Sequence, residues 1–375
     1  TVDAVLMVVD RYVTERPVLF VVEDLHWIDP TSLNLLSRLV DEGLNDQMLT
    51  LLTFRPEFET PWGSRAHQTH LALSRLTEQQ IEEMIRLRLE VPAISAQIVE
   101  QISRRTEGVP LFIEEFSRLI QESGALIEHE GETRLADTFS LQSIPSTLKD
   151  LLVSRLDRMQ SSHDVAQIGA LIGRRFAWDL IRSVTELEHQ TLRRELDKLI
   201  SAEILFEESA HGQPLFTFKH ALIQDAASDS LLKDQLVAFH SRIAAALESE
   251  FPEIAETEPE RVAHHFTQAG EPRRAIDYWL AAGQRAQSQS ANAEAISHLE
   301  TGLDMVLALD ESDDRESLEM ACRLPLIAVL MGARGYAAPE IEPHHTRVQE
   351  IGLKSGDRMI IGQLFQPFWQ WVFIR

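Results

Sequence analysis

Two acidic residues, Glu23 and Asp24, directly follow the short apolar run Val18–Val22. Continuous runs rich in β-branched residues are typical of strands buried in a parallel sheet. Such a strand ends at the edge where open α/β sheets bind phosphate groups. There one carboxylate can hold Mg²⁺, usually through water, and the next can orient an attacking water. We therefore predict Glu23 and Asp24 as catalytic and magnesium-binding residues, with the metal role falling to Glu23 and the water-orienting role to Asp24.

A strand that ends in two acids is, taken alone, more often the start of a solvated loop, so the surrounding sequence decides. The string LFVVEDLHWIDPTSLNLL resembles the Walker B segment of the signal-transduction ATPases with numerous domains, the STAND branch of the AAA-like ATPases. It is especially similar to bacterial ATPase modules fused to class III adenylate/guanylate cyclases or to Ser/Thr kinases. The strings LLTFRPE, RTEGVPLFIEEF and FTFKHALIQDA follow in the order of that family's sensor 1 strand, lid helix and winged helix.

This resemblance implies that the intact protein binds ATP or ADP with Mg²⁺, and it gives roles to three more residues. Arg55 would sense the γ-phosphate; the alternative is a surface arginine before a proline turn. Pro110 would shape the lid against the adenine, and it would equally serve as the first residue of a helix. His220 would contact the β-phosphate of ADP; the alternative is a core or capping histidine. The predicted cofactor-binding residues are thus Glu23, Arg55, Pro110 and His220.

The family also needs a phosphate-binding loop, Gly-x-x-x-x-Gly-Lys-Ser/Thr, upstream of the Walker B strand, and this sequence contains none. The backbone N–H groups and the lysine of such a loop cradle the phosphates. Gly352-Leu353-Lys354-Ser355 is a superficial echo of it, which we interpret as a helix end. We interpret the chain as a piece that starts just after the loop. The order Glu23-Asp24, where AAA proteins commonly have Asp before Glu, favours slow turnover or a nucleotide switch.

The spacing of apolar runs predicts the elements that carry these residues. Val18–Val22 and Met48–Phe54 are expected as buried strands on either side of a helix that starts at Pro30, and Leu71–Leu73 as a third strand. Strand, helix and strand at this spacing favour a parallel sheet. The predicted fold class is an α/β half-domain with a parallel sheet of P-loop NTPase type. A mainly α remainder follows, formed by a helical lid, a winged helix and a tetratricopeptide-like α-solenoid.

Four regions follow from this pattern. A capping box at Thr77–Gln80 begins the helical part, and two short strands around the turn 211–214 indicate a wing. Ala-rich segments after residue 233 resemble tetratricopeptide-like repeats. The expected domains are the C-terminal half of an ATPase core (1–75), a helical lid (76–140), a winged-helix domain (141–235) and truncated helical repeats (236–375).

Composition restricts the compartment and the partners. The formal net charge of −24 repels nucleic-acid phosphate and anionic lipid. The helix expected at Glu188–Ile200 mixes bases with acids, so direct DNA binding is not expected. No apolar run approaches the ~20 residues of a membrane helix, so no membrane contact is expected. A single cysteine, Cys322, fits a reducing compartment, and we predict a cytoplasmic protein whose helical repeats bind a protein partner or a ligand.

Three functions remain open at this point. The first is a regulatory ATPase region that controls a class III adenylate/guanylate cyclase or a kinase located outside this chain. The second is a protein-interaction scaffold without a nucleotide. The third is a LuxR-type transcription regulator.

Because the chain lacks the phosphate-binding loop, ATP·Mg²⁺ titrated into it should bind no more tightly than about 1 mM, which is roughly 4 kcal/mol of binding free energy. Isothermal titration calorimetry on the isolated chain measures this. Micromolar affinity would show that the phosphate site lies elsewhere in the chain.

Overall fold

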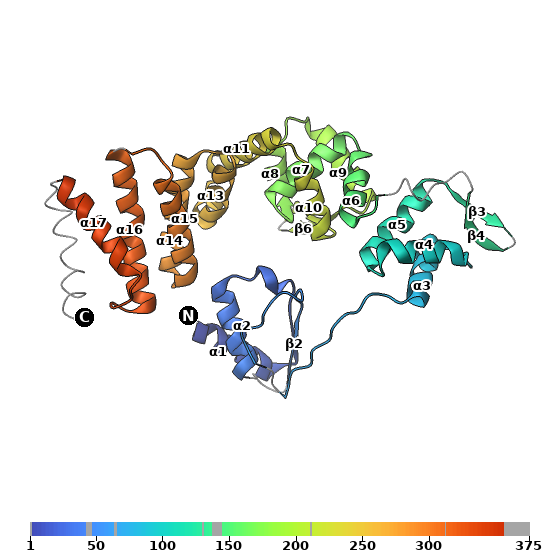
Figure 1. Ribbon diagram of the computed structural model, residues 1–375, viewed down its shortest axis with the longest axis horizontal. Coiled ribbons are helices and arrows are strands. Elements are labelled where there is room, and N and C mark those ends of the chain that lie inside the picture. Colours follow the sequence, from blue (N-terminus) through green and yellow to red (C-terminus); the bar gives the residue numbers. More distant parts are fainter. Residues whose placement is uncertain are drawn as a thin grey trace. The chain divides into compact units, whose positions relative to one another are not determined.

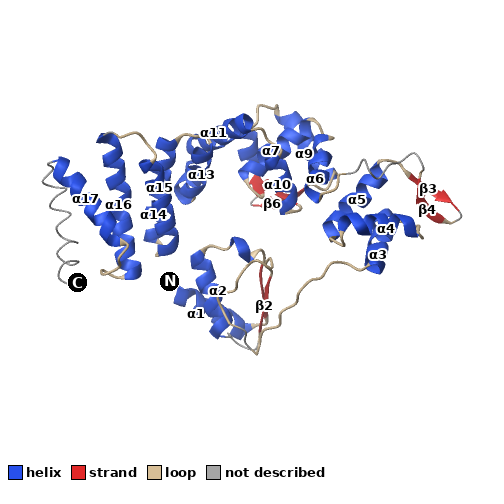
Figure 2. Cartoon of the chain, viewed as in Figure 1, coloured by secondary structure: helices blue, strands red, loops and turns tan. Residues whose placement is uncertain are grey.

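The computed structural model describes residues 2–42, 47–63, 66–129, 131–136, 145–210, 212–311 and 313–355. In these ranges the chain is mostly helical, as Figure 2 shows, and its strands form sheets of only two or three strands. The chain divides into two compact units, one formed by His70–Ala246 and the other by Thr1–Thr69 with Leu247–Arg375. No helix of the described ranges is long and apolar enough to span a membrane.

The N-terminal segment contains one parallel strand pair with helices around it. Its elements are α1 (Val2–Glu15), β1 (Val18–Val22), the 3-10 turn η1 (Leu25–Trp27), α2 (Pro30–Glu42) and β2 (Met48–Leu52). Val18 lies opposite Met48 and Val22 opposite Leu52. One face of the pair is buried, because Phe20, Val22 and Leu52 pack around a small core of Leu25, Leu36 and Trp62.

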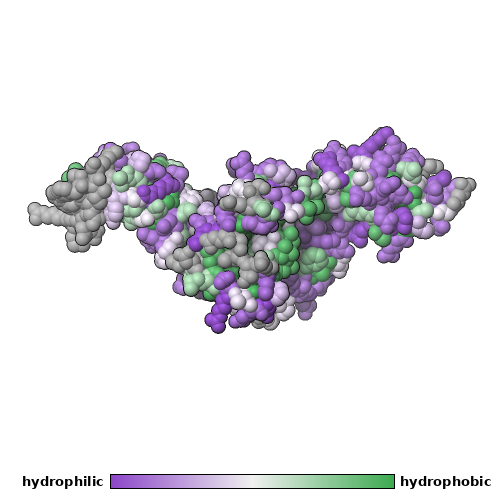
Figure 3. Space-filling model, turned by 90° about the horizontal axis from the view of Figure 1, so that it is seen from below, coloured by the Kyte–Doolittle hydropathy of each residue, from purple (hydrophilic) through white to green (hydrophobic). Residues whose placement is uncertain are grey.

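The other face of the β1–β2 pair is bare. Its four side chains are apolar and lie opposite each other as Leu19–Leu49 and Val21–Leu51. Their exposed fractions are 64% and 67% for the first pair and 45% and 49% for the second. In Figure 3, green hydrophobic surface lies among purple hydrophilic residues on the face shown. Parallel strands are normally covered on both faces, so this pair lacks one of its usual neighbours.

The prediction of an α/β half-domain with a P-loop NTPase-type parallel sheet is wrong. The described residues contain only the β1–β2 pair as a parallel sheet, and most other elements are helices. The expected third strand at Leu71–Leu73 does not form: Leu71 is 81% and Leu73 98% exposed. The two five-residue runs, Val18–Val22 and Met48–Leu52, pair with each other as parallel strands. The run Leu71–Leu73 is not paired, because alternation over three residues is too short to specify a strand.

The second unit begins with a three-helix bundle and a hairpin (Figure 1). These elements are α3 (Glu78–Leu89), α4 (Ala96–Thr106), α5 (Pro110–Glu122), β3 (Leu126–His129) and β4 (Glu132–Leu135). The predicted capping box is present at Thr77, whose side chain accepts from Gln80 N–H while the Gln80 side chain accepts from Thr77 N–H. Gly108 separates α4 from α5 at φ +75°, where a Cβ atom would lie 2.5 Å from the Leu76 carbonyl oxygen. That position therefore requires glycine.

The unit continues with five helices and a three-stranded antiparallel sheet. The elements are α6 (Leu148–Asp157), α7 (Ser161–Ile172), β5 (Arg175–Ala177), α8 (Trp178–Val184), α9 (His189–Ser201), β6 (Leu205–Ala210), β7 (Gln213–Phe218) and α10 (Ala221–Asp229). The sheet order is β5-β7-β6, and Phe176, Phe216 and Phe218 are buried on it. Helix α9 and the two strands around the turn 211–214 lie close to their predicted positions. Strand β5 was missed because three residues show no periodicity. Residues 137–144, at the expected boundary between the lid and the winged-helix domain, lie outside the described residues.

The remaining elements are helices. They are α11 (Lys233–Ser249), α12 (Pro252–Thr257), α13 (Pro259–Gln268), α14 (Pro272–Ser288), α15 (Asn292–Leu307), α16 (Asp313–Arg334) and α17 (Ile341–Ser355). From α13 to α17 each helix packs on the next, forming the row seen in Figure 1. We call α13–α17 the helical row. The sequence echo of a phosphate loop at Gly352 falls in the last turn of α17 and is a helix end, as expected. The aromatic segment 365–375 lies outside the described residues.

Small residues let the helices of this row approach closely. A Cβ atom built on Gly283 of α14 would lie 2.5 Å from Leu299 of α15, whereas one built on Gly332 of α16 meets nothing within 4 Å. Gly283→Ala should therefore destabilise the chain by roughly 1–3 kcal/mol through overpacking. Gly332→Ala should stabilise it by roughly 0.5–1 kcal/mol, because alanine is the better helix former.

Urea denaturation of both variants beside the wild type measures the two shifts, and Gly332→Ala is the matched control. Equal effects of the two substitutions would contradict the close crossing of α14 and α15.

Candidate functional site

The carboxyl ends of β1 and β2 bring together three of the predicted site residues. Glu23 and Asp24 follow β1 directly, and Arg55 lies three residues beyond the end of β2. Backbone hydrogen bonds tie the two exits together: Thr53 N–H donates to the Val22 carbonyl at 3.0 Å, and Leu25 N–H donates to the Thr53 carbonyl at 3.0 Å. The acids and the arginine therefore share one edge of the sheet, as the sequence predicts for residues that follow parallel strands.

Asp24 adopts the left-handed conformation, with φ 59° and ψ 45°. Its N–H donates to the Thr53 hydroxyl oxygen at 3.1 Å, which holds the turn between β1 and η1. Aspartate is one of the few non-glycine residues that adopt this conformation readily, because its short polar side chain can hydrogen-bond locally. The turn therefore directs the chain from β1 into η1 with little strain.

Arg55 is exposed and its guanidinium lies over the indole ring of Trp27, 5.8 Å from the ring centroid. Trp27 is 56% exposed, and its ring centroid lies 4.5 Å from that of His26. The edge thus presents two carboxylates and a guanidinium to solvent. Within the described ranges, no group of three or more His, Cys, Asp or Glu side chains is arranged to hold a metal. A magnesium ion at Glu23 and Asp24 would keep water or phosphate oxygens as its other ligands.

Pro110 and His220 belong to the other unit. Pro110 is the first residue of α5, so its fixed φ starts that helix. His220 precedes α10 as its N-cap, and its Nε2 is buried with no hydrogen-bond partner among the described residues. Burial, and next the positive charge of Lys219, lower the pKa of His220 below its ordinary value. The imidazole is therefore neutral at pH 7.

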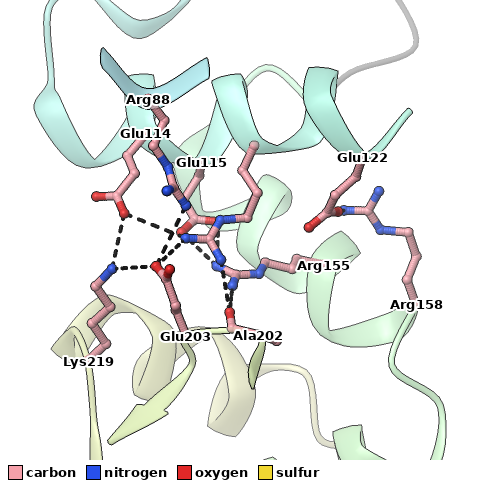
Figure 4. A network of polar contacts seen from close by, with 10 residues as sticks. Arg88, Glu114, Glu115, Glu122, Arg155, Arg158, Ala202, Glu203 and Lys219 are labelled. Atoms are coloured by element: carbon pink, nitrogen blue, oxygen red, sulfur yellow. Dashed lines mark hydrogen bonds and ion pairs between the residues drawn. The ribbon is translucent and has the colours of Figure 1, made fainter. Parts of the chain in front are cut away.

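A partly buried ion network, which the sequence did not predict, lies in the same unit and includes Lys219, the residue before His220 (Figure 4). Arg155 of α6 donates to both carboxylate oxygens of Glu115 of α5, each at 2.6 Å. These two side chains are only 7% and 4% exposed. Arg155 also donates to the Ala202 carbonyl, which accepts a second bond, at 3.0 Å, from Arg118. The carbonyl at the end of α9 is thus held by two guanidinium groups.

Glu203 is the centre of the network. Its Oε2 accepts from Arg118 at 2.6 Å and from Lys219 at 2.9 Å, and Arg88 of α3 lies 3.6 Å away. Lys219 also donates to Glu114 of α5 at 3.1 Å. Hydrogen bonds from Lys219, and next from Arg118, lower the pKa of Glu203 to about 2.

One sequence signal could have revealed this network. In α5 the charged residues Glu115 and Arg118 lie among the apolar positions Phe112, Phe116 and Ile120, all of which are buried. A charge on the apolar side of a helix must find a partner, because an unpaired buried charge is costly. The signal shows that a partner exists but not which residue it is.

Comparisons with known proteins show similarity without a function. A family described as a domain of unknown function (DUF8739) matches residues 77–134, which correspond to α3, α4, α5 and the β3–β4 hairpin. An uncharacterised protein of Rhizobium meliloti (strain 1021) is 27% identical over 374 residues, which cover 98% of this chain. The chain spans 36% of the length of that relative.

The environment of His220 generates a prediction about pH. The pKa of His220 in the folded state lies below its ordinary value of 6.5. The neutral imidazole therefore makes its full contribution to the free energy of unfolding above pH 6.5. The contribution is lost as the pH falls from there through the folded-state pKa. A ¹H–¹³C NMR titration, with the His220 signal assigned by the variant His220→Asn, should give a midpoint below 6.5. Lys219→Met should move the midpoint upward, because it removes a neighbouring positive charge. A wild-type midpoint at or above 6.5 would disprove the burial argument.

Proposed function

We propose that this chain is a regulatory region of a bacterial multidomain signalling protein related to the STAND-type ATPases. In this proposal it contributes part of an ATP/ADP–Mg²⁺ site, and nucleotide occupancy controls an output such as a class III adenylate/guanylate cyclase or a kinase. The observation that carries the proposal is the placement of Glu23, Asp24 and Arg55 at one edge of the parallel β1–β2 pair.

The bare face of β1–β2 supports a site that this chain does not complete alone. Leu19, Val21, Leu49 and Leu51 leave four neighbouring apolar side chains in solvent. Covering such a face is favourable by about 25 cal/mol per Å² of apolar area removed from water. The relative from Rhizobium meliloti is much longer than this chain, which matches 36% of it. We infer that elements outside these residues cover the face and supply the cradle for the phosphates.

The donor set suits the metal and γ-phosphate end of a nucleotide. Bound ATP would supply the phosphoryl group. Glu23 would hold the metal ion through water, and Asp24, fixed by its hydrogen bond to Thr53, would position a water beside it. Arg55 would contact the γ-phosphate with charge-assisted hydrogen bonds, and Trp27 would limit the freedom of its guanidinium. The roles proposed for Pro110 at the adenine and His220 at the β-phosphate remain predictions.

A protein-interaction scaffold is the second candidate, and the helical row favours it. A cavity of about 460 Å³ lies at the start of the row, lined in part by Glu248, Glu256, Tyr278 and Arg285. Its mixed charges and aromatic ring suit a peptide. A DNA reader has less support, because Arg193 of α9 is engaged by Glu207 at 2.6 Å and by Asp197 at 2.8 Å. Its charge is thus neutralised rather than available to phosphate.

Nucleotide binding by the complete native protein tests the proposal. Arg55→Ala should weaken ATP binding about 10- to 100-fold, since a hydrogen bond to a charged group contributes roughly 1.5–3 kcal/mol. ADP binding should change little, because ADP lacks the γ-phosphate. Glu23→Gln should reduce the Mg²⁺ dependence of ATP binding.

Asp10→Asn, which removes a carboxylate from α1, is the control and should leave both affinities unchanged. If the complete wild-type protein bound neither nucleotide, the scaffold function would replace this one. Equal losses of ATP and ADP in Arg55→Ala would refute the γ-phosphate role.

A further inference from the structure

The bundle α3–α5 is joined to the rest of its unit in two different ways. One junction, with α6, is mainly apolar: Leu151 and Leu148 of α6 pack against the core of α3–α5, and the Arg155–Glu115 pair lies at the same contact. The other junction is ionic and runs from α5 to the turn after α9 and to Lys219, which directly follows β7. Apolar contacts are not directional and tolerate rotation, whereas charged hydrogen bonds depend on distance and angle.

Glu203 is the acid at which most of the ionic junction converges, although Arg118 also donates to the Ala202 carbonyl. Glu203 accepts from Arg118 of α5 and from Lys219. In the network drawn in Figure 4, the turn after α9 contributes no acidic side chain other than Glu203. The other acid bonded to Lys219, Glu114, comes from α5 itself. Loss of the Glu203 charge would leave Arg118, Arg88 and Lys219 close together with fewer acids to balance them.

Glu203 has a left-handed backbone, as do Glu90 and Glu107 at the ends of α3 and α4. Glu203 has φ +54°, a left-handed conformation that favours glycine after a helix. A glycine would form this turn with less strain, but it would carry no carboxylate. The turn after α9 is therefore strained at the residue that makes the ionic junction, and such strain persists where the surrounding contacts hold it.

We propose that Glu203, Lys219, Arg118 and Glu114 form a releasable clasp, which locks the α3–α5 bundle in one orientation about the apolar contact with α6. With the clasp closed, the bundle and the β5–β7 sheet move as one body. With Glu203 neutralised or its partners taken by another anion, the bundle turns about α6 while its own core stays packed. The Glu203 carboxylate is 42% exposed, so an anion from solvent can reach the clasp.

A distance measurement tests the clasp directly. Spin labels on Gln97→Cys of α4 and Gln190→Cys of α9 report the orientation of the bundle, and both positions are exposed. Cys322 is fully buried and burial raises its pKa to about 11, so it should stay unlabelled. The wild type should give one narrow distance distribution. Glu203→Gln should broaden it or add a second population of at least one third of the molecules.

Glu207→Gln is the matched control. Glu207 lies four residues further on in β6 and also accepts from an arginine, Arg193, at 2.6 Å and 2.8 Å, but this pair joins α9 to β6 without crossing to the bundle. The distance distribution of the Glu207→Gln variant should match that of the wild type. Lys219→Met removes the clasp's lysine and should reproduce the effect of Glu203→Gln. This second variant keeps the test valid if Glu203→Gln fails to fold.

Circular dichroism should show that each variant keeps its helix content. Distributions identical to the wild type in both Glu203→Gln and Lys219→Met would overturn the proposal, and so would an equal change in Glu207→Gln. None of these outcomes depends on nucleotide binding, so the clasp and the proposed function fail separately.

Discussion

The carboxylate of Glu203 and the carbonyl of Ala202, adjacent in one turn, fix how three segments of the second unit are oriented. Between them they accept hydrogen bonds from Arg118, Arg155 and Lys219, which come from α5, α6 and the residue after β7. Charged side chains within the helices need these acceptors because burial without a partner would be costly. The acceptors in turn depend on the left-handed backbone at Glu203, so local strain and long-range pairing support each other.

In the same unit, apolar contacts and ionic contacts have different roles. The cores of α3–α5 and of the β5–β7 sheet are apolar, with Phe116, Phe176 and Phe216 fully buried. The junction between them carries most of the buried charge, including Glu115 and Arg155. Burial of apolar surface supplies stability without fixing an angle, whereas paired charges fix an angle and add little stability. The family match to residues 77–134 coincides with the part that the apolar core defines.

In the N-terminal segment the decisive feature is the unequal covering of the β1–β2 pair. One face packs on Leu25, Leu36 and Trp62, and the opposite face leaves Leu19 and Leu49 mostly in water. The acids and Arg55 lie at the end of this half-covered pair, where the Thr53 contacts and the Trp27 ring help to set their geometry. A site built on two strands positions a few groups well but cannot enclose a ligand, and this fits a contribution to a larger site.

The sequence by itself determined the features that depend on a few neighbouring residues. The capping box at Thr77, the proline start of α5 and the apolar runs of β1 and β2 followed from local chemistry and periodicity. Only the tertiary structure decided how many strands join the sheet, because pairing depends on edges contributed by distant segments. It also decided the partners of Arg155 and Arg118: Ala202 is 47 and 84 residues away, a separation over which local pattern carries no information.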